Sequence, residues 1–364
     1  MRRPTPSLWP IPLWLILLTG LTIALSGCLW ADGRPTTPTP PSPSPSPSPT
    51  ATPSVSEQTP VLIPLDGPVA ERKAELSGLA WYGDSLLLLP QYPARFSDHL
   101  FALPKEALVS FLDGELDGPL TPLEVDFDDD DLPEEVAGFE GFEAIGIAGE
   151  QVFVTVEARV GDRMQGYLVR GRVAPGRTAI ELEADSRVPI TPQADLSNYS
   201  DEALLIVGER VLTFYEANGV NVNPAPVAHV FGLDLTPQGT LPFPNLEYRV
   251  TDSTALDADG RFWVINYFYP RDRGKLRPLS PEPLAERYGV GATHAAGEPV
   301  ERLVALRYAD SGPVLDDRPP LYLALRADGK ARNWEGVVRL DERGFLLATD
   351  EHPETLLAFV AAPQ

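Results

Sequence analysis

Residues Glu143 to Ala158 read EAIGIAGEQVFVTVEA, and this stretch decides the fold that we expect. A short apolar run follows Glu143, a turn containing Gly149 comes near the middle, and a second apolar run ends at Glu157. Two short runs rich in β-branched residues around a glycine-containing turn indicate a β-hairpin. Because a hairpin folds at its midpoint, we expect Glu143 and Glu157 to lie side by side at its open end.

The same pattern occurs four more times, at residues 77–92, 202–217, 252–267 and 335–351. The opening polar residues of the five segments are Ser77, Glu143, Glu202, Asp252 and Glu335. The closing polar residues are Gln91, Glu157, Glu216, Asn266 and Asp350. Opening and closing residues are 14 positions apart in the first four segments and 15 apart in the fifth. A repeated hairpin at this spacing indicates a repeat architecture.

Outer strands are expected after each hairpin. We predict them at 98–104 and 120–127, 165–173 and 179–185, 227–235 and 245–250, 301–308 and 321–326, and 355–361. The fifth unit lacks its last strand, which residues 61–65 can supply. Five four-stranded units closed by an N-terminal strand make an all-β, five-bladed β-propeller. The alternatives are a β-sandwich, two unrelated β domains, or six blades; we assign the excess length before Glu335 to an inserted loop at 271–299.

The N-terminus carries a targeting signal. Arg2 and Arg3 precede an apolar run from Leu13 to Leu25, and small residues lead to Cys28, as in a secretory signal. The ending Leu25-Ser26-Gly27-Cys28 resembles the lipobox of bacterial lipoproteins, which implies cleavage before Cys28 and acylation of its thiol. A signal anchor with a chance cysteine is the alternative. We expect a signal peptide at 1–27, a flexible linker rich in Pro, Ser and Thr at 28–60, and the propeller at 61–364. The protein would be extracytoplasmic and lipid-anchored to a bacterial cell membrane.

Composition narrows the function classes. The 52 acidic and 29 basic residues give a net charge of -23, which argues against nucleic-acid binding. A hydrophobic content of 43% is enough for a folded core. The single cysteine excludes a disulfide framework and a thiolate zinc cluster. We expect a monomer.

The opening residues predict a metal site. The first strand of each propeller blade lines the central channel, so Ser77, Glu143, Glu202, Asp252 and Glu335 would form a ring. Carboxylates packed in a narrow channel repel one another unless a cation compensates them or their pKa values are raised. Calcium suits such a ring of oxygen ligands, whereas zinc would require His or Cys. A solvated acidic channel mouth is the alternative.

Two family resemblances support this interpretation. The ring, with Ser77 in Glu75-Leu-Ser-Gly-Leu, three further Glu and one Ser or Asp, resembles that of the calcium-activated nucleotidase (apyrase) propellers. That resemblance implies five blades and one calcium, with Ser253 an alternative to Asp252 as the fourth ligand. The motifs Trp334-Glu335-Gly336-Val337 and Thr349-Asp350-Glu351 resemble the bacterial phytase-like (esterase-like) propellers, which are generally secreted. Pro90-Gln91-Tyr92-Pro93 replaces the nucleotidases' Asp-Asp-Arg-Thr-Gly stretch, which disfavours nucleotide hydrolysis.

Basic residues near the expected channel mouth suggest a ligand. Arg159, Arg271 and Arg273 would bind a small anionic ligand or ester above the calcium, and Glu157 or Glu216 would activate water. The alternative is that these arginines balance nearby acids on a solvated surface. We therefore expect a calcium-dependent hydrolase of an ester or phosphoester. The alternative is a non-catalytic ligand- or protein-binding propeller in which calcium is structural.

Overall fold

The computed structural model describes residues 55, 57–174 and 179–363. Cys28, the predicted signal peptide and most of the predicted linker lie outside these residues. The chain divides into two compact units, of which the described residues belong to the unit Ala51–Gln364. Among the described residues no helix is both long and apolar enough to span a bilayer.

The fold is mostly β. The predicted hairpins all form, each between two consecutive antiparallel strands. Their strands are β3 (Leu76–Tyr82) and β4 (Ser85–Pro90), β7 (Phe139–Ala148) and β8 (Gln151–Val160), β11 (Asp201–Val207) and β12 (Arg210–Tyr215), β15 (Arg249–Ser253) and β16 (Arg261–Phe268), and β20 (Trp334–Leu340) and β21 (Gly344–Thr349).

Outer strands extend the hairpins into four sheets. They are β5 (His99–Pro104), β6 (Leu123–Asp128), β9 (Arg163–Val173), β10 (Ala179–Ile190), β13 (Val227–Gly232), β14 (Pro237–Pro242), β17 (Val300–Ala309), β18 (Gly312–Leu315), β19 (Leu321–Leu323) and β22 (Leu357–Ala361). The first two hairpins share one eight-stranded sheet, because their outermost strands β6 and β10 pair in parallel. Two other sheets have four strands each, and the sheet that contains β15 has six.

The N-terminal segment adds a strand to each of the last two sheets. As predicted, β2 (Val61–Ile63) pairs with β22, and it forms the edge of that sheet. In addition, β1 (Glu57–Gln58) pairs in parallel with β19, so the ordered chain begins inside the segment expected to be linker.

One predicted outer strand was wrong. Instead of 245–250, the sheet of the third hairpin ends with β14, which pairs with β13 at the edge, where the prolines of β14 are tolerated. Residue Arg249 instead begins β15. This shift places an arginine at the start of a first strand.

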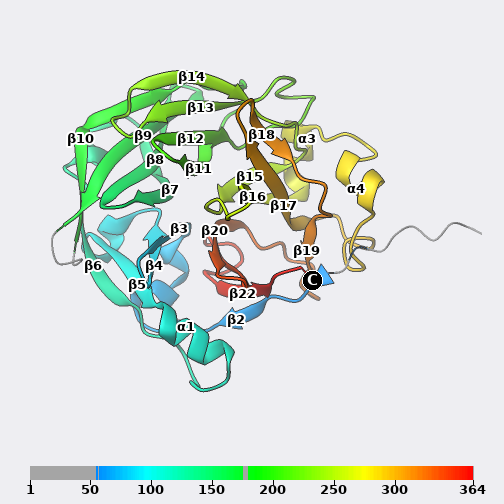
Figure 1. Ribbon diagram of the computed structural model, residues 1–364, viewed down its shortest axis with the longest axis horizontal. Coiled ribbons are helices and arrows are strands. Elements are labelled where there is room, and N and C mark those ends of the chain that lie inside the picture. The colour runs from blue at the N-terminus through cyan, green and yellow to red at the C-terminus, as the bar shows by residue number, and fades with distance from the viewer. Residues whose placement is uncertain (1–54, 56, 175–178, 364) are drawn as a thin grey trace, which may run out of the picture. The chain divides into compact units, whose positions relative to one another are not determined.

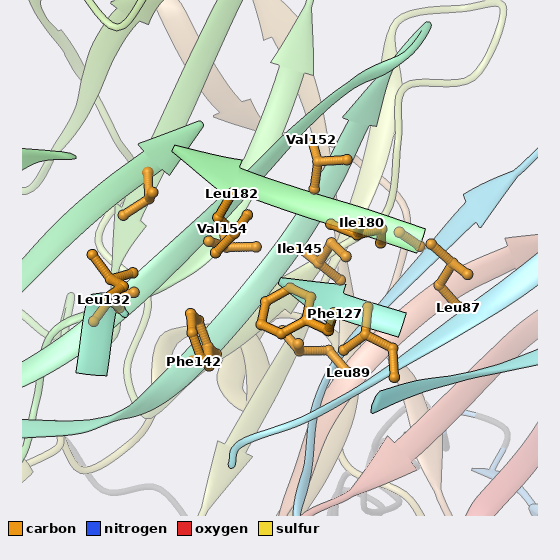
Figure 2. Close-up of a cluster of buried hydrophobic side chains, with 14 of the residues drawn as sticks. Leu87, Leu89, Phe127, Leu132, Phe142, Ile145, Val152, Val154, Ile180 and Leu182 are labelled. Carbon is orange, nitrogen blue, oxygen red and sulfur yellow. The ribbon is translucent and has the colours of Figure 1, made fainter. Parts of the chain in front are cut away.

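The first strands of the hairpins lie innermost (Figure 1). Strand β3 contacts β7, β7 contacts β11, β11 contacts β15, β15 contacts β20, and β20 contacts β3. Hydrophobic clusters fill the space between neighbouring hairpins and their outer strands. Figure 2 shows one of them, in which Leu89, Phe127, Phe142 and Ile145 pack between the strands of the first two hairpins. The ends of the innermost strands are thereby held close together.

Short helices lie in the connections. They are η1 (Pro68–Ala70), η2 (Arg72–Ala74), η3 (Pro93–Phe96), α1 (Lys105–Leu112), α2 (Leu132–Glu135), η4 (Pro270–Asp272), α3 (Arg273–Leu276) and α4 (Pro283–Tyr288). The last three lie in the insertion that the sequence indicates between β16 and β17. Part of this insertion lines the cavity described next.

Candidate functional site

Each first strand begins with a β-bulge. The register shifts fall between Leu76 and Gly78, Phe142 and Ala144, Asp201 and Ala203, Val250 and Ser253, and Trp334 and Gly336. The bulge contains the opening residue in every hairpin: this residue alone is unpaired in four of them, and in β15 the shift spans Thr251 and Asp252. Bulges re-aim a side chain out of the regular alternation of a strand. This explains locally how Ser77, Glu143, Glu202 and Glu335 come to face one place.

That place is a cavity of about 1010 Å³ at the open ends of the hairpins. It brings together four of the five predicted ring residues and three of the predicted closing residues. The lining side chains of these two sets are Ser77, Glu143, Glu202, Glu335, Gln91, Glu157 and Asp350. The insertion contributes Tyr269, Pro270, Arg271, Gly297, Glu298 and Pro299 to the same wall.

Asp252 does not line this cavity. Its Oδ1 accepts a hydrogen bond from Ser253 N and its Oδ2 accepts one from Val337 N, both at 2.7 Å. The Ser253 hydroxyl, the alternative ligand, donates to Leu204 O at 2.7 Å. Both side chains thus join β15 to neighbouring first strands, and neither faces the ring.

Arg249 lies among the carboxylates instead. Its Nη2 is 3.4 Å from Glu202 and 3.5 Å from Glu335, and its Nε contacts Glu216. Its Nη1 donates to Asn333 Oδ1 at 3.2 Å. Burial lowers the pKa of Arg249, but the charges of Glu202 and Glu335 raise it by more. The pKa is raised overall, so the guanidinium stays charged. Sequence analysis missed this residue because it assigned 245–250 to an outer strand.

The carboxyl groups away from Arg249 have few compensating partners. Glu143 is 6% exposed and accepts a hydrogen bond from Gln91 Nε2 at 2.9 Å. Burial, followed by Glu157 and Glu202, raises the pKa of Glu143 well above its usual range. Glu157 is 5% exposed, and its Oε1 has no hydrogen-bond partner in the described chain. Burial and then Glu202 raise the pKa of Glu157 to about 8.

Glu202 differs from Glu157 because it has a cationic neighbour. Burial raises its pKa to about 7, while Arg249 lowers it. On the fifth hairpin, Asn333 Nδ2 donates to Glu335 Oε1 at 2.5 Å and to Asp350 Oδ2 at 2.7 Å. Burial raises the pKa of Asp350, and the Asn333 hydrogen bond lowers it in part. The cavity thus holds carboxyl groups whose surroundings differ.

Of the other predicted catalytic and ligand-binding residues, only Arg271 lines the cavity. Glu216 is fully buried, contacts Arg249 and does not line the cavity. Arg159 forms a two-point ion pair with Glu140, at 2.5 and 2.7 Å, and does not line the cavity. Arg271 does line it, beside Tyr269. Arg273 lies over the Phe268 ring, outside the lining set.

The side chains as placed do not fit a metal ion. Within the part of the chain that the structure describes, no three His, Cys, Asp or Glu side chains are grouped so that they could hold one. The Arg249 guanidinium contacts both Glu202 and Glu335, and so occupies the place where these two carboxylates would have to bind a metal ion together. The calcium ring therefore stays a prediction.

Comparison with known proteins gives no family. No family model matches the chain, and no curated protein matches it. Solved structures with a similar arrangement include an α-L-arabinanase mutant from Cellvibrio cellulosa, at 11% identity and TM-score 0.44 over 78% of this chain and 90% of that one. An exo-1,5-α-L-arabinanase from a bovine ruminal metagenomic library has 10% identity and TM-score 0.43 over 81% and 95%. A glucose dehydrogenase has 13% identity and TM-score 0.40 over 81% and 98%.

Identities this low leave activity open. The proteins named are similar to this chain only in how their strands are arranged. None of the three belongs to the nucleotidase or phytase-like families, so those resemblances stay predictions.

Proposed function

We propose that this chain is a five-bladed β-propeller closed by β2, and that its cavity is the active site of a hydrolase. The observation that carries the proposal is Glu157, a buried carboxyl group in the cavity wall with an oxygen that no described residue hydrogen-bonds. Leaving a buried polar atom unpaired costs about 1–3 kcal/mol. Such a cost is expected where a bound ligand supplies the missing partner.

The two kinds of carboxyl group suit general acid–base catalysis. Among the described residues no cation forms an ion pair with Glu157, although the charge of Arg249 lowers its pKa in part, and Glu157 would protonate the leaving oxygen of a substrate. Glu202 is held beside Arg249 and would take the proton of the attacking water. Pairs of carboxyl groups in unlike surroundings are the usual way that one site supplies both an acid and a base. Glu216 would support Arg249 rather than touch the substrate.

The charge of the cavity favours an uncharged substrate. Its lining carboxylates outnumber its Arg and Lys side chains by seven to three. The carboxylates are Glu75, Glu143, Glu157, Glu202, Glu298, Glu335 and Asp350, and the bases are Arg249, Arg271 and Lys330. Because Arg159 is paired with Glu140, it does not offset this excess. Arg249 is held by Glu202, Glu216 and Glu335, which leaves Arg271 and Lys330 as the lining cations that could face a phosphoester. We therefore propose a neutral ester or another uncharged substrate with an oxygen leaving group.

A panel of nitrophenyl substrates tests this function. We expect the wild type to turn over uncharged nitrophenyl esters or glycosides and to leave nitrophenyl phosphate intact. Glu157→Gln should lower kcat by about 100-fold or more, the usual contribution of a general acid. Glu150→Gln, on the exposed hairpin turn, is the matched control. Equal turnover by Glu157→Gln and wild type, or a preference for the phosphate, would contradict the proposal.

We also propose that lipidation of Cys28 tethers the propeller outside the cytoplasm. The lipobox-like ending and the Pro/Ser/Thr-rich segment after it support this. In a bacterial host, the full chain should incorporate labelled fatty acid and sediment with membranes, while Cys28→Ala should do neither. Unchanged labelling of Cys28→Ala would reject the tether.

A further inference from the structure

The carboxylate cluster around Arg249 has the layout of an ion site with a side chain at its centre. Three carboxylates from three different strands or strand ends, Glu202, Glu216 and Glu335, contact one guanidinium. Glu202 and Glu216 are 6% and 0% exposed. Buried carboxylates drawn from distant parts of a chain to one point require a compensating charge there.

Arg249 comes from the hairpin whose predicted ring residue, Asp252, does not face the cavity. In the other four hairpins the bulge residue faces the cavity, but the bulge residue of β15, Asp252, accepts hydrogen bonds from two backbone amides. Arg249, three residues earlier on the same strand, reaches the ring instead. The strand that would complete a set of oxygen ligands therefore supplies a cation.

The guanidinium is held on several sides. Its Nη1 donates to Asn333, and Asn333 in turn donates to Glu335 and Asp350. The ring of Tyr267 lies 5.8 Å from the guanidinium carbon. The side chain is 15% exposed. These contacts hold the guanidinium in one place, whereas a solvated surface arginine would be free to move.

We propose that Arg249 is the resident cation of this cluster, in the place that a metal ion would otherwise take. Removing the guanidinium would leave Glu202, Glu216 and Glu335 as oxygen donors around a vacated centre. Because calcium accepts several oxygens in loose geometry, the variant cluster would bind a divalent cation. A guanidinium is wider than an ion, which explains why the carboxylates as placed do not form a metal site.

Thermal unfolding of the folded domain in EDTA and in millimolar calcium tests the proposal. The wild type should unfold at the same temperature in both. Arg249→Met, which keeps much of the side-chain length, should unfold at least about 5 °C lower in EDTA, because it leaves buried carboxylates unpaired. Calcium should restore part of that loss by binding the folded state. Arg249→Lys keeps a positive charge and should show no response to calcium.

Two results would overturn the proposal. One is a wild type that is purified with calcium and loses stability in EDTA, because a metal would then be resident already. The other is an Arg249→Met variant that neither loses stability nor responds to calcium. If that variant does not fold, the metal content and EDTA response of the wild type still decide the question. These readings use stability and metal content, so their failure is distinguishable from failure of the hydrolase proposal.

Discussion

At the scale of single residues, Glu157 is a buried and poorly compensated acid of the cavity. It is 5% exposed, and one of its oxygens has no partner in the described chain. A carboxylate is costly to keep ionised in such surroundings, so burial, followed by the charge of Glu202, raises the pKa of Glu157 to about 8. At neutral pH this group is therefore mostly protonated and able to donate its proton.

The raised pKa of Glu157 predicts how stability depends on pH. A carboxyl group with a higher pKa in the folded state holds its proton more tightly when folded. Its contribution to the free energy of unfolding is full below its ordinary pKa of 4.5 and is lost as pH rises through about 8. We expect urea denaturation to show stability falling from about pH 5 to about pH 8.

Glu157→Gln isolates this contribution. The variant should be more stable than the wild type at the alkaline end of that range, and the difference should shrink toward the acidic end. Glu150→Gln, which is exposed, should follow the wild type throughout. A gap between Glu157→Gln and wild type that does not change with pH would contradict the assignment.

At the scale of elements, the first strands approach one another too closely for a side chain at some positions. A Cβ on Gly336 would lie 2.8 Å from Leu79 Cγ and 3.3 Å from Leu79 N. Gly336 directly follows the ring residue Glu335, so its small size lets β20 pack on β3 where the cavity begins.

Gly336→Ala should therefore separate β20 from β3. We expect a loss of about 1–3 kcal/mol in the free energy of unfolding, as for other overpacked sites. Gly274→Ala is the control, because a Cβ there meets no atom within 4 Å. Chemical denaturation of both variants measures the effect, and equal stabilities would show that β20 can move aside freely.

The N-terminal strand β1 also hydrogen-bonds the insertion between β16 and β17. Glu57 accepts hydrogen bonds from Thr293 N and Thr293 Oγ1 at 2.9 Å, and its Oε1 is 2.7 Å from His294 Nδ1. Burial raises the pKa of Glu57, but the hydrogen bonds from His294 and Thr293 lower it by more, so the pKa is lowered overall. The cavity-lining residues Gly297 to Pro299 follow shortly after this contact.

Glu57→Ala should loosen that part of the cavity wall. We expect faster amide hydrogen exchange across residues 289–299, with the sheets otherwise unchanged, because several backbone and side-chain donors lose one acceptor. Glu71→Ala, whose carboxylate is exposed and pairs with Lys73, is the control. Unaltered exchange in the insertion would show that Glu57 does not hold it.

At the scale of the whole described unit, the two ends of the chain depend on each other. Strand β2 pairs with β22, and Ile63 is 2% exposed. A chain that begins at Asp66 would lose β1 and β2, including about 2 kcal/mol from the burial of Ile63 alone. Its melting temperature should fall by several degrees relative to a chain that begins at Ala51. Identical melting curves would contradict this closure.

The sequence could predict the hairpins because each is a local pattern. The apolar runs, the central turns and the near-constant spacing recur in every unit, and the ring residues Glu143, Glu202 and Glu335 follow from them. The place of Arg249 could not be predicted in the same way. It depends on whether residues 245–250 form the outer strand of the third hairpin's sheet or lead into the first strand of the fourth hairpin. The turn of Asp252 toward Val337 depends on contacts 85 residues apart.

If Glu157 and Glu202 act as acid and base on an uncharged substrate, both groups should be visible in the pH dependence of kcat/KM. On the substrate that the wild type turns over best, the profile should be bell-shaped, with limbs set by the pKa of Glu202, about 7, and that of Glu157, about 8. Glu157→Gln should remove the alkaline limb from its residual activity, and Glu202→Gln should remove the acidic limb. Profiles in both variants that match the wild type would contradict the account.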